Sequence, residues 1–414
     1  MKPTTYQCEL YESIDDVDQE EWREICRQTN NISLDPRFLK AVEISFAAES
    51  KIWYAIFRDE NGRAVAATCF SRFMVDGSMM APSTIQNLAS RVRRVWSGFM
   101  RLPILLCGLP ISMCDHQLAI AENVDDEALL TALDATAIKI ARKARCRLIS
   151  FKEFPPALAK RMDRLSQFGF LKARSVYAYH LEGEYGSFDN YLASRNSSTR
   201  QNIKRSFRRF DEAGLTCEQV LGRDGIEHLI TPEVYELYVR VLERADVKFE
   251  RIPLSFFHEL ARQMPDDSHY TIIRKGEKIV GFGCAVAGMG QHSLIVMGLD
   301  DASNRDTDLY FNIVYRGIQD ALVPGVRVIH IGAAADEFKQ RIGCQGEWLS
   351  IYVKTANSLG NLFMQQIFKL CLDTQDAYNA PAPSSPQKPT PKPVKTAADT
   401  NRQKLELESL TIGK

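Results

Sequence analysis

The sequence predicts an α/β (α+β) protein of two tandem domains, each built on a mixed, mostly antiparallel sheet flanked by helices. A chain of 414 residues with 45% hydrophobic content can bury two cores of ordinary size. The same succession of strand and helix patterns also occurs once in each half of the chain, in pattern more than in identity. Two similar domains of this kind are expected to face one another across a cleft.

The repeated pattern begins with two strands joined by a polar turn. In the first half they cover residues 51–57 and 64–75, and in the second half residues 269–274 and 279–288, where the strand HSLIVMGL follows. An amphipathic helix leading into a buried strand comes next, as DEALLTALDATAIKIARKARCRLISF and as LYFNIVYRGIQDALVPGVRVIHIG. Each copy closes with a further strand, within residues 168–181 and 342–354.

Changes in composition divide the chain into three parts. Residues 1–183 form the first domain, with an opening helix around DQEEWREICRQ, and the glycines at 183 and 186 mark its end. Residues 184–375 form the second domain, which closes with the helical run NLFMQQIFKLCLD. Residues 376–414 are expected to be a disordered Pro-rich tail, since six prolines lie between Asn379 and Val394, and this tail is a candidate binding segment for a protein partner.

Charge, cysteine usage and hydropathy point to a cytoplasmic protein without a membrane span. Lys plus Arg and Asp plus Glu are both 52, so only a local patch can attract a polyanion. The ten cysteines have no framework spacing, which favours reduced thiols. The N-terminus is acidic rather than signal-like, and the longest apolar stretch, Leu102–Cys114, is interrupted by two prolines and reads as strand and turn.

A strongly basic helix is predicted at the start of the second domain, in FDNYLASRNSSTRQNIKRSFRRFDEAG. Ser or Thr at 197–199 are the candidate caps, and Gly214 ends the helix. The pattern places an apolar stripe of Ile203, Phe207 and Phe210 along one side of the helix. Beside it lies a row of cations at every fourth residue, formed by Arg200, Lys204 and Arg208. Arg205 and Arg209 extend this positive surface. This surface either binds phosphates or is a solvated helix face that pairs with acidic neighbours.

Four segments together resemble a known superfamily. Tyr191-Leu-Ala-Ser with Arg200-Gln-Asn-Ile-Lys204-Arg205, the hairpin GEKIVGFGCAVAG, the helix DLYFNIVYRGIQDAL and the closing EFKQRIGCQ resemble, in order and spacing, the catalytic-type domain of Fem-like and CelD-like GNAT acyltransferases. The resemblance covers residues 187–355 well and the N-terminal half more loosely. It implies two GNAT-like domains and an N-acyltransferase that moves an acyl or aminoacyl group to an amine of a small metabolite, a peptide or a cell-envelope precursor. The alternative is a catalytically inactive GNAT-like scaffold that binds an anionic ligand or a protein partner.

The resemblance also implies roles for individual residues. Lys339 in the closing segment is expected to stabilise the oxyanion, with His330 or Glu337 as the base and Tyr310 as a hydrogen-bond donor to the substrate. Without the resemblance, these side chains would read as a surface lysine, a core histidine and a packing tyrosine. Binding of the phosphate-bearing donor is expected from Arg200, Lys204, Arg205 and Arg208.

The donor itself stays open at this stage. GNAT enzymes hold coenzyme A with a glycine-rich loop at a helix N-terminus, whereas residues 304–310 contain no glycine. Asp306 and Asp308 are suited to cap that helix themselves, so acyl-CoA competes with aminoacyl-tRNA as the expected donor.

No metal site is expected from the sequence. Cys107, Cys114 and His116 lack a fourth ligand, and Arg262 interrupts the zinc-protease pattern that His258 begins. Since only the second half carries the basic helix and the closing segment, the site is predicted there, and the first half is expected to be structural.

Overall fold

The computed structural model describes residues 5–27, 29–76, 91–93, 99, 101–245, 250–323, 325–333 and 335–356. The expected helix at 361–373 and the expected disordered tail at 376–414 lie outside these ranges. Both halves of the repeat belong to one compact unit.

The first half folds as the repeat predicts. Its helices are α1 (Gln19–Arg27), α2 (Pro36–Ser45), α4 (Asp126–Lys143) and α5 (Pro156–Met162). Its strands are β1 (Gln7–Tyr11), β2 (Lys51–Arg58), β3 (Ala64–Asp76), β4 (Arg101–Cys107), β5 (Leu118–Ile120), β6 (Leu148–Phe154) and β7 (Leu171–Glu182). The apolar stretch at 102–114 supplies β4 and the turn after it, as predicted.

The second half repeats the strand and helix order with additional helices. Its strands are β8 (Leu215–Leu221), β9 (Ser268–Lys275), β10 (Lys278–Gly288), β11 (Gln291–Leu299), β12 (Val328–Gly332) and β13 (Gln345–Thr355). Its helices are α6 (Phe188–Ser194), α7 (Ser197–Glu212), α8 (Ile226–Leu229), α9 (Pro232–Arg244), α10 (Leu254–Gln263), α11 (Asp301–Thr307), α12 (Leu309–Ala321) and α13 (Asp336–Arg341). The α/β class and the flanked, mostly antiparallel sheets are therefore confirmed.

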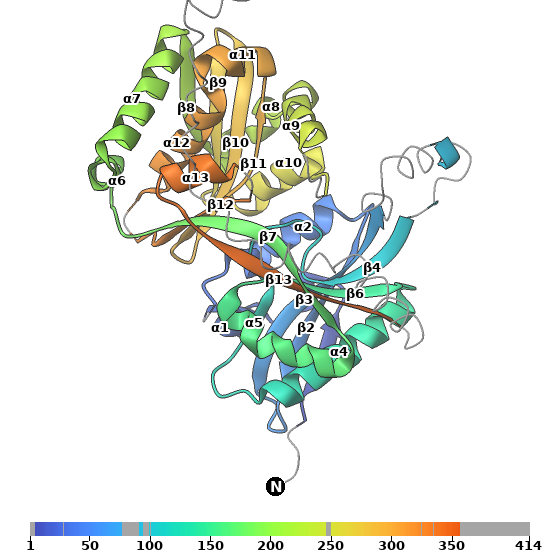
Figure 1. The fold of residues 1–414 in the computed structure, drawn as a ribbon. Coiled ribbons are helices and arrows are strands. Elements are labelled where there is room, and N and C mark those ends of the chain that lie inside the picture. The colour runs from blue at the N-terminus through green and yellow to red at the C-terminus, as the bar shows by residue number, and fades with distance from the viewer. Residues whose placement is uncertain are drawn as a thin grey trace, which may run out of the picture. The chain divides into compact units, whose positions relative to one another are not determined.

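One continuous sheet runs through both halves, because the closing strands are exchanged between them. The order is β1-β2-β3-β4-β6-β13-β7-β12-β11-β10-β9-β8, with β5 beside β3. Strand β13, the last of the second half, lies between β6 and β7, while β7, the last of the first half, lies between β13 and β12. Figure 1 shows these two long strands side by side. The predicted division at residue 183 thus falls after an exchanged strand, and it stays a prediction.

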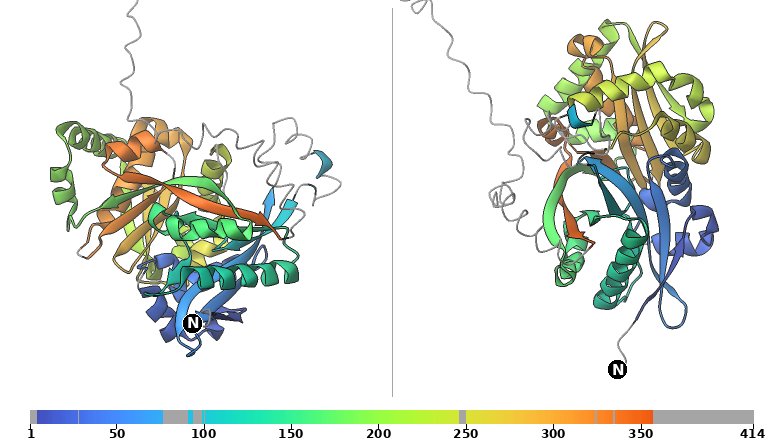
Figure 2. Two further views of the ribbon diagram at one scale, coloured as in Figure 1. Left: turned by 60° about the horizontal axis from the view of Figure 1, so that its bottom comes forward. Right: turned by 90° about the vertical axis from the view of Figure 1, so that its right-hand side faces the viewer.

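Helices cover both faces of each part of the sheet. Side chains alternate between the two faces along a strand, and apolar side chains on both faces are buried by these helices. On β2, Tyr54 and Ile56 join the core under α1 and α2, whereas Trp53 and Ala55 join the core under α4. Figure 2 shows these helices on opposite sides of the strands.

In the second half, α12 and α9 cover opposite faces of β10 and β11. Gly281 and Gly283 admit the side chains of Leu309 and Ile313 from α12. On the other face, Gly298 admits the backbone of α9 near Tyr238. Small residues in the strands thus let both helices approach the sheet closely.

The core under α1 and α2 also extends into the second half. It continues to α9 and α10, and Phe38 meets Phe256 with ring centroids 6.1 Å apart. An ion pair of 2.6 Å between Arg37 and Asp267 adds a polar contact. The halves therefore share apolar contacts as well as a sheet.

The basic helix forms as predicted, but its cap differs. Asn196, not a residue at 197–199, caps α7 by accepting from the Thr199 N–H at 2.8 Å. Ile203 and Phe210 are buried and Phe207 is half-buried, so the apolar stripe is confirmed. The amide of Asn196 is suited to capping because its oxygen reaches the free N–H groups of the first turn.

Candidate functional site

The closing segment of the resemblance forms α13, and its lysine turns inward. Lys339 is 2% exposed, and its ammonium group donates to the carbonyls of Gly332 at 3.0 Å and Ala333 at 2.7 Å. These carbonyls lie where β12 ends, so the lysine closes the turn between β12 and α13. Burial lowers the pKa of Lys339 to about 8. An ammonium has three N–H donors, which leaves one for a substrate.

Lys339 lines a cavity of about 310 Å³ that includes residues of both halves. Strand β11 and helices α9 and α12 supply a largely apolar wall, which includes Tyr238, Leu294, Met297 and Val314. The first half contributes Ser112, Met113 and Cys114 from the segment after β4. The loop after β4 therefore reaches into the cavity of the second half, while the expectation that the first half is structural stays a prediction.

A network of buried and half-buried polar groups joins the halves at this wall. The backbone N–H of Ser112 donates to the carboxylate of Glu250, and the Ser112 hydroxyl donates to Glu153 at 2.5 Å. Lys152 lies 3.5 Å from Glu153 and donates to the carbonyl of Ile111 at 3.1 Å. Lys152 thus pairs with Glu153, and Ser112 links Glu153 to Glu250. Burial raises the pKa of Glu250, which makes it a stronger base than an exposed glutamate.

The other predicted catalytic residues divide between the cavity and its surroundings. Tyr310 lines the cavity, and burial raises its pKa to about 12, so its phenol stays a hydrogen-bond donor at neutral pH. Glu337 is exposed on α13 and is not part of the lining.

His330 is also absent from the cavity wall, to which its neighbour Ile331 belongs. Its ring lies 6.3 Å from that of His180, and burial lowers the pKa of His330. Glu250 is instead the carboxylate beside the cavity. Nothing in the surrounding DVKFE sequence marks it.

A thiol also faces the cavity, at Cys114. Burial raises the pKa of Cys114 to about 12, so this group stays protonated near neutral pH. A protonated thiol is a poor nucleophile.

The predicted phosphate-binding residues lie on α7 and not on the cavity wall. Lys204, Arg205 and Arg208 are exposed, and Arg208 is 3.8 Å from Glu212. No ion pair joins Lys204 or Arg205 to a carboxylate within the described ranges. Arg200 differs, because its guanidinium donates to the carbonyl of Arg195 at the start of the helix. The exposed part of this surface is thus available to a ligand.

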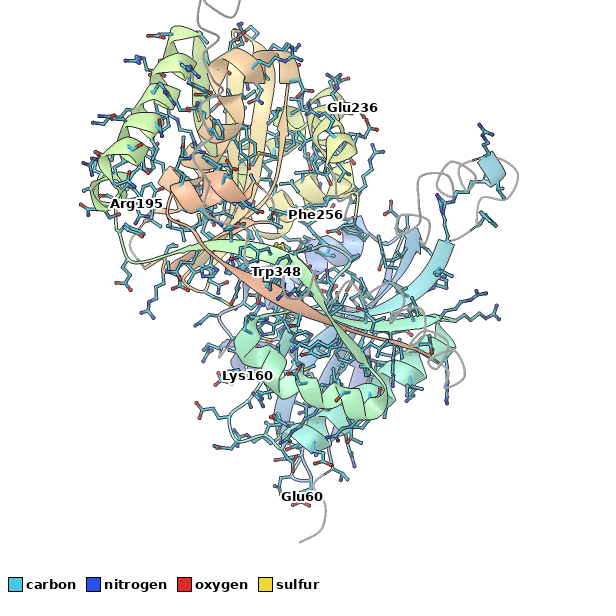
Figure 3. All side chains as sticks on the ribbon, in the orientation of Figure 1. Glu60, Lys160, Arg195, Glu236, Phe256 and Trp348 are labelled. Atoms are coloured by element: carbon cyan, nitrogen blue, oxygen red, sulfur yellow. The ribbon has the colours of Figure 1, made fainter. Side chains whose placement is uncertain are left out.

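Arg195 fastens the same end of α7 to the closing segment. Its guanidinium lies over the ring of Tyr191, 5.2 Å from the centroid, and donates to the carbonyl of Ile342 at 3.3 Å. Figure 3 shows Arg195 beside this end of α7 and Trp348 on the exchanged strand β13. The basic surface is therefore held against the element that carries Lys339.

The helix start that would hold the pyrophosphate of coenzyme A is already engaged. Residues 301–307 form α11, and the side-chain oxygen of Asn304 accepts from the Tyr310 N–H at 2.8 Å. Asp308 adopts a left-handed conformation without capping α12, and its carboxylate pairs with Arg209 at 3.3 Å. The prediction that Asp306 and Asp308 cap this helix is therefore wrong, because Asn304 does so from the preceding turn.

A family profile described as peptidoglycan biosynthesis/recognition, FemAB-like, matches residues 13–368. The chain belongs to the FemAB-like family. This confirms the Fem-like resemblance and makes the chain an enzyme of the acyl- or aminoacyl-transferase class. None of the curated proteins matches it in sequence.

Solved structures show the same fold at low sequence identity. The FemX crystal structure is 12% identical, with a TM-score of 0.54 over 87% of this chain and 99% of FemX. L-PGS from Bacillus licheniformis is 11% identical, with a TM-score of 0.49 over 86% of this chain and 96% of that protein. A tandem GNAT protein from the clavulanic acid biosynthesis pathway is 14% identical, with a TM-score of 0.47 over 85% of this chain and 99% of that one. The likeness to FemX confirms the tandem GNAT-like fold of this FemAB-like chain.

Among the helices that the structure describes, none combines the length and the apolar composition that crossing a bilayer requires.

Proposed function

We propose that this FemAB-like protein transfers an aminoacyl group to an amine within the cavity that Lys339 lines. The observation that carries the proposal is the buried ammonium group of Lys339, which two carbonyls hold in place and which retains one N–H donor. Such a preorganised cation stabilises negative charge strongly where water is excluded. Its place beside an apolar wall suits a reacting carbonyl.

The reaction would proceed by direct attack. The amine nitrogen attacks the carbonyl carbon of the aminoacyl ester, and the electron pair of the C=O bond moves to oxygen, where Lys339 stabilises it. The carboxylate of Glu250 accepts the proton that the amine loses, since its raised pKa suits it to this role. Collapse of the intermediate breaks the bond to the donor oxygen, which takes the proton from Glu250 and leaves as a hydroxyl group.

Aminoacyl-tRNA fits the structure better than acyl-CoA as the donor. The start of α12 is engaged by Asn304, and Asp308 adds a negative charge where a pyrophosphate would bind. Exposed cations at Lys204, Arg205 and Arg208 suit the extended phosphate backbone of a nucleic acid.

The acceptor that we propose is an amine on a peptidoglycan or other cell-envelope precursor. The family description supports this class of substrate. A cavity of about 310 Å³ holds an aminoacyl group and the end of an acceptor side chain, so the rest of both substrates would lie outside. The described cysteines are all free thiols, which supports a cytoplasmic reaction.

The proposal is tested by following label from charged tRNA to amine-bearing precursors. Lys339→Met should lower the turnover number by about 100-fold to 1,000-fold, the cost of losing one oxyanion donor. Lys275→Met, which removes an exposed lysine of β9, is the matched control and should transfer at the normal rate.

Thermal stabilisation separates the donors. Charged tRNA at 100 times its dissociation constant should stabilise the chain by about 2.7 kcal/mol. Stabilisation by acyl-CoA alone would reverse the donor assignment. A chain that binds charged tRNA yet transfers nothing to any precursor would be the inactive scaffold.

A further inference from the structure

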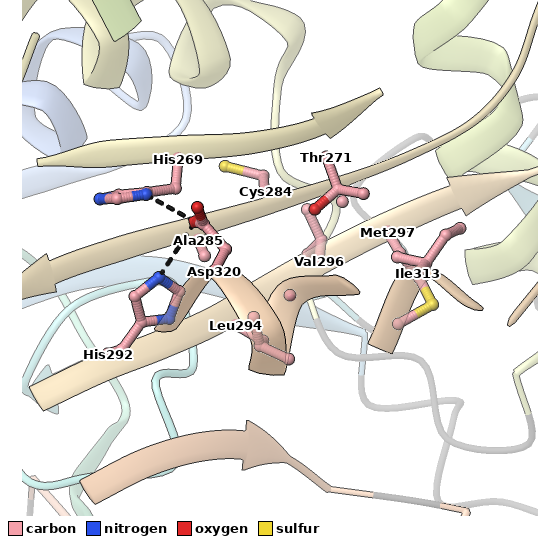
Figure 4. A pocket seen from close by; sticks show the side chains of 12 residues that line it. His269, Thr271, Cys284, Ala285, His292, Leu294, Val296, Met297, Ile313 and Asp320 are labelled. Carbon is pink, nitrogen blue, oxygen red and sulfur yellow. Dashed lines mark hydrogen bonds and ion pairs between the residues drawn. The ribbon is translucent and has the colours of Figure 1, made fainter. Parts of the chain in front are cut away.

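Three side chains far from one another in sequence converge on the face of the sheet that α12 covers. His269 comes from β9, His292 from β11 and Asp320 from the last turn of α12 (Figure 4). The Nδ1 atom of His269 lies 2.6 Å from Oδ2 of Asp320, and the Nε2 atom of His292 lies 3.8 Å from the same oxygen. Their nearest ligand atoms all lie within 4.8 Å of one another.

The strand register creates this convergence. Strand β10 separates the two histidines and pairs Ala285 with His269 and Ala287 with His292. Alanine side chains leave the space between the rings open, and the ring centroids are 5.1 Å apart. Asp320, in the last turn of α12, lies over this space.

The buried histidine has an unmet bonding capacity. His292 is 1% exposed, and neither ring nitrogen has a hydrogen-bond partner among the described residues. Buried polar groups are almost always hydrogen-bonded, so a buried ring whose one polar contact is the 3.8 Å approach of Nε2 to Asp320 calls for an explanation.

The carboxylate of Asp320 is not stabilised by the dipole of its own helix. It lies in the last turn of α12, where the helix dipole disfavours a negative side chain. Its carboxylate faces a ring nitrogen of each histidine from a helix end that favours a cation.

We propose that His269, His292 and Asp320 bind one divalent transition-metal ion of the zinc type. Two imidazole nitrogens and a carboxylate oxygen are ligands that zinc prefers, whereas magnesium and calcium prefer oxygen alone. Ligand atoms around tetrahedral zinc lie about 3.4 Å apart, given bond lengths of about 2.0–2.1 Å. The 3.8 Å contact is close to that value, and the hydrogen bond of 2.6 Å opens when the metal replaces its proton.

The surroundings leave room for a fourth ligand and for entry. A cavity of about 20 Å³ lies against the three side chains, which is enough for one water molecule. The side chains of His269 and Asp320 are 19% and 20% exposed, so an ion reaches them from solvent. Sequence patterns do not reveal this site, because its ligands come from three separate elements.

The metal would act as a structural clamp below the proposed active cavity. Leu294, Val296 and Met297 line both the small cavity and the large one. Helix α12 carries Asp320 near its end and Tyr310 near its start. A bound ion fixes α12 to the sheet and thereby stabilises the wall that the two cavities share.

The site is tested by metal titration of the chelator-treated full chain. We expect one equivalent of Zn²⁺ to bind and raise the melting temperature, and Co²⁺ to give the absorption bands of a nitrogen–oxygen site. Mg²⁺ should do neither. The double variant His269→Gln with Asp320→Asn should lose the equivalent, while His228→Gln, which changes an exposed histidine of α8, should keep it.

Circular dichroism of each variant before titration separates lost binding from lost folding. Because His269 and Asp320 are partly exposed, their amide replacements should preserve the fold. Equal binding by the double variant and the chain with native residues would overturn the proposal, as would a folded native chain that takes up no Zn²⁺ or Co²⁺.

Discussion

The protonation state of the buried Lys339 side chain decides whether it can play the proposed catalytic role. Its pKa of about 8 means that its ammonium form prevails at neutral pH and is lost as the pH rises further. Because only the ammonium form stabilises an oxyanion, kcat/KM should fall on the alkaline side with an apparent pKa near 8. On the acid side it should fall as the raised pKa of Glu250 is passed and the base becomes protonated.

Variants assign the two limbs of this pH profile. Lys339→Arg should move the alkaline limb upward, since a guanidinium stays charged throughout. Glu250→Gln should abolish the acid limb and lower the rate. An alkaline limb that stays near pH 8 in active Lys339→Arg would contradict the assignment to Lys339.

A second buried lysine, Lys354, joins the exchanged strand β13 to the first half. Its ammonium group pairs with Asp134 of α4, and the two side chains are 6% and 11% exposed. Asp134→Ala would leave a buried charge without its partner, so it should lower the free energy of unfolding by about 3–5 kcal/mol. Urea unfolding measures this loss.

The exposed pair Arg27–Glu24 provides the matched comparison. Its side chains are 73% and 68% exposed, so Glu24→Ala should change stability by less than about 1 kcal/mol. The double change Asp134→Leu with Lys354→Met should recover most of the loss from Asp134→Ala. If Asp134→Ala costs no more than Glu24→Ala, the buried pair is not coupled to folding.

At the scale of elements, α7 presents a cationic surface whose effect on binding is measurable. Replacing Lys204, Arg205 and Arg208 by Gln should weaken binding of charged tRNA and flatten its salt dependence, because fewer counterions are released. Filter binding at several salt concentrations measures both effects. The slope of log K against log salt should fall by about 0.7–0.9 for each phosphate that the variant no longer neutralises.

Three exposed cations of the first half serve as the control for α7. Changing Arg142, Lys160 and Arg164 to Gln removes the same charge far from α7 in the sequence. The slope should then stay close to that of the native chain. Equal effects of the two triple variants would show that the charges of α7 act only through the total charge.

Sequence patterns predicted most strands and helices, because each depends on local alternation or helical periodicity. They did not predict which strands pair, since β7 and β13 have the same pattern whichever half they join. Lys339 lies in a local sequence motif, so the sequence alone indicates it as a site residue. Glu250 lies in no such motif. Its place beside Ser112 results from packing between the halves.

The cap of α7 shows the limit at a single helix end. Three Ser or Thr residues at 197–199 compete with Asn196, and all three types of side chain cap helices well. Asn196 lies directly before the first residue of α7, and its side-chain oxygen accepts from the Thr199 N–H. The choice among neighbouring polar residues depends on where the chain enters the fold.

At the scale of the whole molecule, the exchange of β7 and β13 makes the halves depend on each other. Residues 1–183 alone would keep β7 but lose β12 and β13, its two neighbours in the sheet. The core around Phe38 would also lose Phe256. We therefore expect the two pieces 1–183 and 184–414 to fail to fold separately and to regain structure when refolded together.

Circular dichroism and urea unfolding of each piece measure this dependence. A chain of residues 1–380 is the control, because it retains both halves of the compact unit and should unfold in one cooperative transition. An unpaired β6 edge and an exposed apolar face around α2 should make the first piece aggregate. Cooperative unfolding of residues 1–183 on their own would show that this half folds without the strands it receives from the other half. The boundary at residue 183 would then be a true domain boundary.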